Sequence, residues 1–311
     1  MKILVTGAAG YIGSILCEYL LKENYKVTAL DSFMYNDQSL NAYLNNKNFE
    51  VIKSDVRNTS ELKNILPKHD LIIPLAALVG APLCDFEKKS AEEINFGSIK
   101  FIVDNLSKDQ RIIYPTTNSG YGIGKEDSFC TEESPLNPIS IYGVTKVNAE
   151  KYIANFDNNI SFRLATVFGI APRMRLDLLV NDFVYKAYKD GSIVLFESHF
   201  KRNYIHIRDV CKAFMFAISN FDNLKSNVYN LGLSEANYTK KQLCEVIQKR
   251  IKKLVIYESN IGKDIDKRDY IVSNEKIEKK GFKASITIEE GIEELLKLYS
   301  IFLPNRNMRN Y

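Results

Sequence analysis

The sequence of 311 residues lacks the cysteine and histidine patterns that mark a disulfide scaffold or a metal site. Its five cysteines are odd in number and scattered, with no CxxC pair, and its three histidines lie far apart, with no HExxH motif. Such spacing disfavours both a disulfide framework and a zinc centre. We therefore expect reduced thiols, a cytoplasmic location and no bound metal.

Long apolar runs and dense blocks of one charge are also missing. No apolar run approaches the roughly 20 residues that span a bilayer, and the N-terminal segment breaks into glycines too early for a signal peptide. Lys and Arg number 42 against 38 Asp and Glu, a net charge of +4 without a basic block. This balance argues against membrane insertion and against dedicated nucleic-acid binding, and it leaves room for a basic pocket that holds a small anion.

The first half of the chain alternates short apolar runs with patterns of helical period. This alternation predicts an α/β fold with a doubly wound parallel sheet covered on both faces. Residues 1–167 should form this domain, which also receives parts of 204–231, and residues 168–311 mainly a smaller mixed C-terminal lobe. We expect strands at 2–6, 26–31, 49–54, 70–76, 111–115, 160–166 and 228–231, and helices at 11–23, 60–66, 87–106, 140–156, 239–251 and 288–302.

A glycine pattern follows the first expected strand directly and opens the first helix: Gly7, Gly10 and Gly13. In such a turn one glycine permits the tight bend, one lets the backbone approach a pyrophosphate, and one lets the helix pack on the strand. The N-terminus of the helix then offers free N–H donors to the phosphates. The pattern predicts a dinucleotide site, the alternative being a plain turn between strand and helix.

Asp31 ends the second expected strand, 18 residues after Gly13. A carboxylate there accepts hydrogen bonds from both ribose hydroxyls and repels a 2′-phosphate, so it favours NAD over NADP. Asp55 and Val56 follow the third strand, where they are candidates for contact with the adenine.

Tyr142 and Lys146 are spaced to share one helix face. An ammonium beside a tyrosine lowers the pKa of the phenol, which makes it usable as a general base. The chain holds four Tyr–Lys pairs at this spacing, so context has to select one. Tyr142 begins a helix 25 residues after Thr117, which lies just past the fifth strand, at the sheet edge where ligands bind.

Taken together, these motifs resemble the extended short-chain dehydrogenase/reductase family, the NAD-dependent nucleotide-sugar epimerases and dehydratases. The resemblance runs nearly to the end of the chain. It rests on the glycine turn, Asp31, Leu75-Ala76-Ala77, Asn95, Thr116-Thr117, Tyr121-Gly122, Tyr142 with Lys146, residues 163–169, 202–206, 229–232, 266–270 and 289–292. It implies a Rossmann-type NAD-binding domain and a nucleotide-sugar-binding lobe.

The resemblance also implies roles for individual residues. Thr117 would bind the reacting sugar hydroxyl, Tyr142 would take its proton, and Lys146 would bind the nicotinamide ribose and hold Tyr142 anionic. The cofactor-binding residues would be Gly7, Gly10, Tyr11, Ile12, Gly13, Asp31, Asp55, Val56, Leu75, Ala76, Ala77, Tyr142 and Lys146. The substrate-binding residues would be Asn118, Ser119, Arg173, Arg175, Asn181, Arg202 and Arg268.

One departure from the family pattern bears on the reaction. Dehydratases of this family carry an acidic pair directly after the catalytic Thr, whereas this chain has Asn118 and Ser119. Neither side chain can act as a carboxylic acid, so the elimination step lacks its general acid and base. The sequence therefore disfavours a 4,6-dehydratase and favours oxidation at one sugar carbon.

Three further stretches, residues 78–84, 115–124 and 173–177, are similar to the GDP-manno-heptose C4 dehydrogenases of bacterial capsule heptose pathways. That similarity implies a 4-keto sugar product, a GDP-linked substrate, and a 2-oxo acid such as 2-oxoglutarate that reoxidises the cofactor. A C4 epimerase of the UDP-glucose/galactose type stays open as the alternative, and a catalytically silent NAD sensor is disfavoured by the intact triad. Family members commonly dimerise through helices that correspond to 87–106 and 140–156, so we also expect a homodimer.

Overall fold

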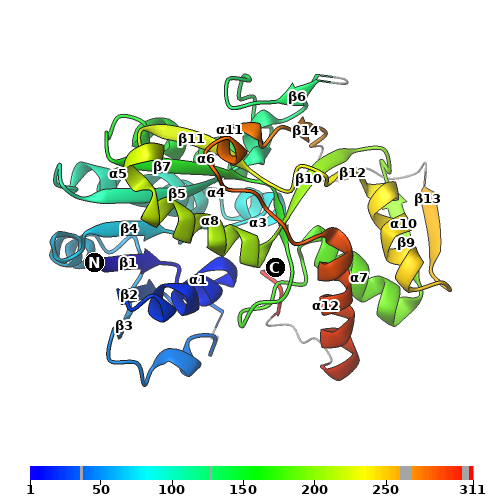
Figure 1. Cartoon of the computed structure of the whole chain (residues 1–311), viewed down its shortest axis with the longest axis horizontal. Helices are drawn as coiled ribbons and strands as arrows, with labels where there is room; N and C mark the ends of the chain where they lie inside the picture. Colours follow the sequence, from blue (N-terminus) through cyan, green and yellow to red (C-terminus); the bar gives the residue numbers. More distant parts are fainter. Residues whose placement is uncertain (36–37, 126–127, 260–267, 303–307, 311) are drawn as a thin grey trace.

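The computed structural model describes residues 1–35, 38–125, 128–259, 268–302 and 308–310. A seven-stranded parallel sheet forms the larger part of the molecule, at the left and centre of Figure 1. From one edge to the other its strands are β11 (Asn227–Leu231), β7 (Asn159–Leu164), β5 (Arg111–Thr117), β4 (Leu71–Pro74), β1 (Lys2–Thr6), β2 (Lys26–Asp31) and β3 (Phe49–Lys53). The order reverses between β1 and β4, and such a switch point is where ligands bind in open α/β sheets.

Alternate side chains of β1 enter two separate cores, which is why this strand reads as a continuous apolar run. Ile3 and Val5 join the core under α1 (Tyr11–Lys22) and α8 (Ile207–Ser219), and Leu4 joins the core on the opposite face. That second core lies under α2 (Thr59–Ile65), α5 (Ser98–Asp104) and α6 (Ile141–Ile153). The expected Rossmann-type fold is confirmed.

A smaller mixed lobe lies to the right in Figure 1 and carries two of the three small sheets. It holds β8 (Thr166–Phe168), β9 (Ser192–Phe196), β10 (Lys201–His206), β12 (Asn237–Thr239), β13 (Val255–Ser259), α7 (Leu179–Asp190), α10 (Lys240–Arg250) and α12 (Ile288–Ile301), and β6 (Phe129–Cys130) pairs with β14 (Ile271–Val272) above the large sheet. The remaining short helices are α3 (Ala81–Phe86), α4 (Lys88–Glu92), α9 (Phe221–Leu224), α11 (Glu275–Glu278), η1 (Asn41–Tyr43), η2 (Leu66–Lys68) and η4 (Asn118–Tyr121).

The two parts share one apolar core. Buried side chains of α1 and α8 are continuous with those of α7, α10 and α12, so the lobe is packed onto the Rossmann domain along its length. Residue 167, the expected boundary, lies inside β8, which pairs with β10, and β11 from the later part of the chain joins the large sheet.

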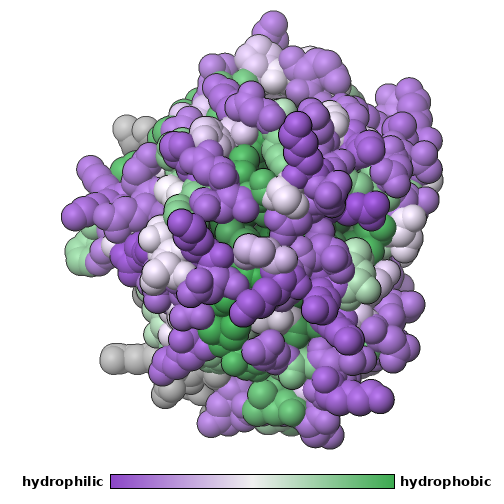
Figure 2. Space-filling model, turned by 90° about the vertical axis from the view of Figure 1, so that its left-hand side faces the viewer, coloured by the Kyte–Doolittle hydropathy of each residue, from purple (hydrophilic) through white to green (hydrophobic). Residues whose placement is uncertain are grey.

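The outer surface of the Rossmann part is largely hydrophilic. Figure 2, which views the molecule from the left of Figure 1, shows polar residues over most of this face and apolar residues in a narrow band between them. Within the described residues, no helix is long and apolar enough to cross a membrane. All five cysteines lie in the described part of the chain as buried free thiols.

The expected helix 87–106 is not one helix. It consists of α4, a π-helical turn η3 (Glu93–Gly97) and α5. The π turn carries Asn95, whose side chain is buried. Its amide oxygen accepts a hydrogen bond from the Leu78 N–H, and its amide nitrogen donates to the Leu78 carbonyl and to the Thr145 hydroxyl. A π turn of this kind is frequent at functional sites, and here it ties the loop after β4 to α6 one residue before Lys146.

Candidate active site

A cavity of about 670 Å³ runs from the carboxyl ends of β1, β2 and β3 across the switch point into the lobe. The glycine turn between β1 and α1 forms one end of this cavity. Gly7 has a φ of +68°, and a Cβ there would lie 2.5 Å from the backbone nitrogen of Ala76. A Cβ on Gly13 would lie 2.5 Å from the carbonyl oxygen of Gly7. Only glycine fits at either position, and the turn leaves the N-terminus of α1 open to the cavity.

Asp31 stands beside this turn. Its carboxylate accepts hydrogen bonds from the Ala9 N–H at 3.0 Å and the Phe33 N–H at 2.7 Å. These bonds fix the carboxylate at the end of β2, the position from which an acidic side chain binds the ribose hydroxyls of NAD. The donor set and the glycine turn therefore fit the adenosine diphosphate half of NAD.

The other predicted cofactor residues also line the cavity, with two qualifications. The hydroxyl of Tyr11 donates to the Gly169 carbonyl at 2.6 Å, so this side chain ties α1 to the lobe. The carboxylate of Asp55 is bound by Arg57 at 2.8 Å, which lowers its pKa. Gly7, Gly10, Ile12, Gly13, Val56, Leu75, Ala76 and Ala77 all border the cavity.

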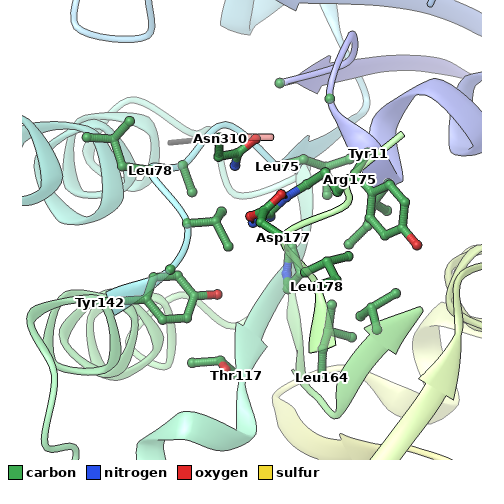
Figure 3. Close-up of a pocket in the computed structure, with 18 of the residues that line it drawn as sticks. Tyr11, Leu75, Leu78, Thr117, Tyr142, Leu164, Arg175, Asp177, Leu178 and Asn310 are labelled. Carbon is green, nitrogen blue, oxygen red and sulfur yellow. Dashed lines mark hydrogen bonds and ion pairs between the residues drawn. The ribbon is translucent and has the colours of Figure 1, made fainter. Parts of the chain in front are cut away.

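Thr117, Tyr142 and Lys146 all line the cavity. Figure 3 shows the hydroxyls of Tyr142, from α6, and of Thr117, from the end of β5, on the same side of the cavity. The side chain of Ser140 caps α6 by accepting from the Gly143 N–H at 3.1 Å. Thr117 donates to Ser119 at 2.9 Å, and Arg268 donates to the same Ser119 hydroxyl.

Burial sets the protonation of this group. It raises the pKa of Tyr142 to about 12 and lowers the pKa of Lys146 to about 7. The groups that pull the pKa of Tyr142 down are, in order, the charge of Arg268, a hydrogen bond with Thr117 and the charge of Arg175. Burial disfavours the charged form of both groups and is the largest cause of both pKa shifts.

Lys146 is positioned by an aromatic ring and by a nearby carboxylate. Its ammonium lies 4.1 Å from the ring centre of Tyr114, and the charge of Glu150, one turn along α6, raises its pKa against the effect of burial. Glu150 is itself paired with Arg163 from β7 at 2.6 Å, and Arg163 also donates to the Tyr121 hydroxyl at 2.9 Å. This buried network links α6, β7 and the turn after β5 behind the triad.

The predicted substrate residues divide into two groups. Ser119, Arg175, Arg202 and Arg268 line the cavity, and Arg175 is paired there with Asp177. Asn118 and Asn181 do not border the cavity and are 1% and 0% exposed, so the assignment of both to substrate is corrected. Asn181 accepts from the Gly169 N–H and donates to the Arg175 carbonyl, which makes it a support for the loop between β8 and α7.

Arg173 has contacts that the sequence did not indicate. It lines the cavity, but its backbone N–H donates to Ser14 in the first turn of α1, and its guanidinium lies 4.6 Å from the ring centre of Tyr35. Arg173 also donates to Asn310 at 3.1 Å. It therefore lies in the part of the cavity wall that Tyr35 and Asn310 also form.

Several residues of the cavity were not predicted. Asn310 reaches it from the other end of the chain, because the Met308 carbonyl accepts from the Leu176 N–H at 2.7 Å and lays this segment over the loop (Figure 3). Asp177, Asp182, Lys186, Phe196 and Lys240 line the lobe side. No spacing signal marks them, since α7 and β9 meet only in the folded chain.

Comparison with known proteins agrees with this geometry. The sequence profile of the NAD dependent epimerase/dehydratase family matches residues 3–232. The chain belongs to this family. It is 29% identical over 253 residues to an uncharacterized UDP-glucose epimerase of Bacillus subtilis, covering 76% of this chain and 78% of that protein.

Solved structures of two enzymes superpose on nearly the whole chain. The UDP-glucuronic acid 4-epimerase of Bacillus cereus, solved with UDP-glucuronic acid and NAD, is 25% identical with a TM-score of 0.83, covering 97% of this chain and 100% of that one. The dTDP-glucose 4,6-dehydratase of Bacillus anthracis, solved with NAD, is 22% identical with a TM-score of 0.82, covering 99% and 98%. The chain is thus an NAD-dependent enzyme of the nucleotide-sugar epimerase/dehydratase family.

Proposed function

We propose that this enzyme oxidises a nucleotide sugar at C4 and yields the 4-keto sugar without loss of water, with GDP-manno-heptose in capsular polysaccharide biosynthesis as the substrate. The observation that carries the proposal is the composition of the cavity around the triad. Thr117, Tyr142 and Lys146 are assembled beside the cofactor turn, but the two positions after Thr117 supply an amide outside the cavity and a hydroxyl inside it.

The carboxylates of the cavity support an oxidation without elimination. Among the described residues that line it, Asp31 and Asp55 lie at the cofactor end and Asp182 at the far end of the lobe side. Asp177 is nearer, but it is buried in a pair with Arg175. A dehydratase needs a free acid beside the sugar carbons next to the ketone, and none of these four fills that place.

The chain's own residues would divide the work of the oxidation. Thr117 binds the sugar hydroxyl, and Tyr142, as the phenolate, accepts its proton within hydrogen-bond reach. Lys146 binds the ribose of the nicotinamide. Arg202 and Arg268, which line the cavity beyond the triad, bind the diphosphate. NAD supplies the hydride acceptor when it is bound, and the fixed carboxylate of Asp31 selects it over NADP.

The reduced cofactor must be reoxidised, because a net oxidation leaves the hydride on it. A 2-oxo acid such as 2-oxoglutarate is the proposed second substrate. Its carbonyl would take the place of C4, and its carboxylates would meet the cationic groups Arg202 and Arg268. The hydride and the proton held by Tyr142 would then convert the ketone to a 2-hydroxy acid.

The second candidate is a C4 epimerase, which returns the hydride to the other face of the keto sugar. It uses the same triad, and a UDP-glucose epimerase and a UDP-glucuronic acid 4-epimerase are among the similar proteins. Purified enzyme incubated with GDP-manno-heptose separates the two. An increase in the near-ultraviolet absorbance of reduced nicotinamide, reversed by 2-oxoglutarate, supports the dehydrogenase. A C4 epimer formed with no oxidant present supports the epimerase.

A homodimer is proposed through α4, η3, α5 and α6, which lie within residues 87–106 and 140–156. Light scattering of the purified enzyme tests this: a mass of two chains is expected. A surface charge introduced on that face, Val144→Glu, should give one chain, since Val144 is 40% exposed on α6.

A further inference from the structure

The lobe end of the cavity, beyond the proposed diphosphate residues, is lined by one helix and one strand. Leu179, Asp182, Phe183 and Lys186 come from α7, and Val194, Leu195 and Phe196 come from β9. If Arg202 and Arg268 bind the diphosphate and the sugar lies at Tyr142, the nucleobase must lie in the lobe end of the cavity. The inference below rests on the proposed GDP-linked substrate.

β9 offers a flat apolar surface there. Ile193 and Leu195 are each 1% exposed and enter the core of the lobe, whereas Val194 is 53% and Phe196 is 37% exposed. On this outer side Val194 and Phe196 follow Ser192, and an exposed aromatic ring gains from contact with a planar partner. The surface suits the face of a base.

Asp182 and Lys186 supply the polar edge. They are one turn apart on α7, and the Lys186 ammonium lies 2.6 Å from Oδ2 of Asp182. Oδ1 of Asp182 lies 3.3 Å from the Arg309 guanidinium. The Asp182 side chain is 15% and the Lys186 side chain 46% exposed. Each carboxylate oxygen has more than one lone pair, so both oxygens can accept further bonds.

We propose that this pair recognises guanine. The guanine edge presents a carbonyl acceptor, a ring N–H donor and an amino donor in a row. Lys186 donates to the carbonyl, and the two oxygens of Asp182 accept from the N–H and the amino group. Uracil presents acceptor, donor and acceptor, so one of its carbonyls would face an Asp182 oxygen. The Asp182 oxygen that attracts the amino group of guanine would repel the carbonyl oxygen of uracil at the same position. The pair therefore favours GDP over UDP.

Nucleotide binding to the NAD-loaded enzyme tests the inference, with GDP, IDP and UDP as titrants in a calorimeter. IDP lacks only the amino group. Since a hydrogen bond to a charged group is worth about 1.5–3 kcal/mol, wild type should bind GDP roughly 10- to 100-fold more tightly than IDP. Asp182→Asn should remove most of that difference and weaken GDP binding by a similar factor.

Asp190→Asn is the matched control, because Asp190 ends the same helix outside the cavity. It should leave the GDP-to-IDP ratio as in wild type, and the melting temperatures of both variants report any change in folding. Equal binding of GDP and IDP by wild type, or an unchanged ratio in Asp182→Asn, overturns this inference alone. Tighter binding of UDP than of GDP overturns the GDP-linked substrate as well.

Discussion

At the scale of single residues, the proton acceptor Tyr142 is the most exacting part of the site. Replacing it by Phe removes the group that takes the hydroxyl proton and keeps the ring that fills its place. We expect sugar oxidation to slow by roughly 100- to 10,000-fold, with the fold and the bound dinucleotide unchanged. Stopped-flow measurement of cofactor reduction checks this, and near-normal turnover would show that the base is elsewhere.

The pH dependence of the same step should depend on Arg268. Arg268 is the strongest of the charges that lower the pKa of Tyr142, and its removal leaves the opposing effect of burial unbalanced. Arg268→Gln should therefore shift the rising limb of the pH–rate profile toward higher pH. Arg202→Gln is the control, because Arg202 is not among the groups that act on this pKa. A shift of equal size in both variants would contradict the assignment.

At this scale the sequence indicated that Thr117, Tyr142 and Lys146 belong to one site, and all three line the cavity. It did not indicate the electrostatics of these groups. The pKa values depend on how deeply α6 is buried and on Arg268, which is far away in the sequence. Asn118 and Asn181 were assigned to substrate because motif position carries no information on which way a buried amide points.

At the scale of elements, the cofactor turn depends on Gly7. Gly7→Ala forces a Cβ against the backbone of Ala76 at 2.5 Å in a left-handed conformation, so we expect loss of bound NAD and a lowered melting temperature. Gly191→Ala is the matched control: Gly191 has a similar φ of +64°, but nothing lies within 4 Å of its Cβ position. That variant should cost only about 1 kcal/mol of stability and retain NAD. Equal effects would mean that backbone strain alone explains Gly7.

The loop between β8 and α7 should control how firmly the dinucleotide is held. Arg173 joins this loop to Tyr35, from the loop after β2, and to Asn310. Arg173→Ala should speed the dissociation of NADH by roughly tenfold or more, measured by the decay of its fluorescence on dilution. Arg111→Ala removes a similar stacked arginine, 4.7 Å from the ring of Phe221 and outside the cavity, and should leave this rate unchanged. Unaltered dissociation from Arg173→Ala would remove the loop from cofactor retention.

The strands of the large sheet were predictable because each is a short apolar run bounded by turns, and β1 and β2 match their expected bounds. The interruption of the helix expected at 87–106 was not predictable. The π turn places Asn95 against Leu78 and Thr145, and these contacts leave no trace in the local hydrophobic period. The short strands of the lobe pair only across long stretches of chain, as β9 does with β13. The pairing of these strands could therefore not be predicted from the local sequence pattern.

At the scale of the whole molecule, one continuous core holds the lobe against the Rossmann domain and places the cavity between them. The segment 266–267, part of the motif around Arg268, lies outside the described residues, whereas Arg268 itself reaches Ser119 beside the triad. The family, its dependence on NAD and the cavity are established. The identity of the sugar and the reaction at its C4 are what we propose.

Mass spectrometry of the sugar product tests that proposal most directly. NAD-loaded enzyme is incubated with GDP-manno-heptose, with and without 2-oxoglutarate. The account predicts a product two hydrogens lighter than the substrate, formed catalytically only with 2-oxoglutarate, together with 2-hydroxyglutarate in equal amount. A product that has lost water would contradict the interpretation of Asn118 and Ser119, and a product of unchanged mass epimerised at C4 would contradict the dehydrogenase.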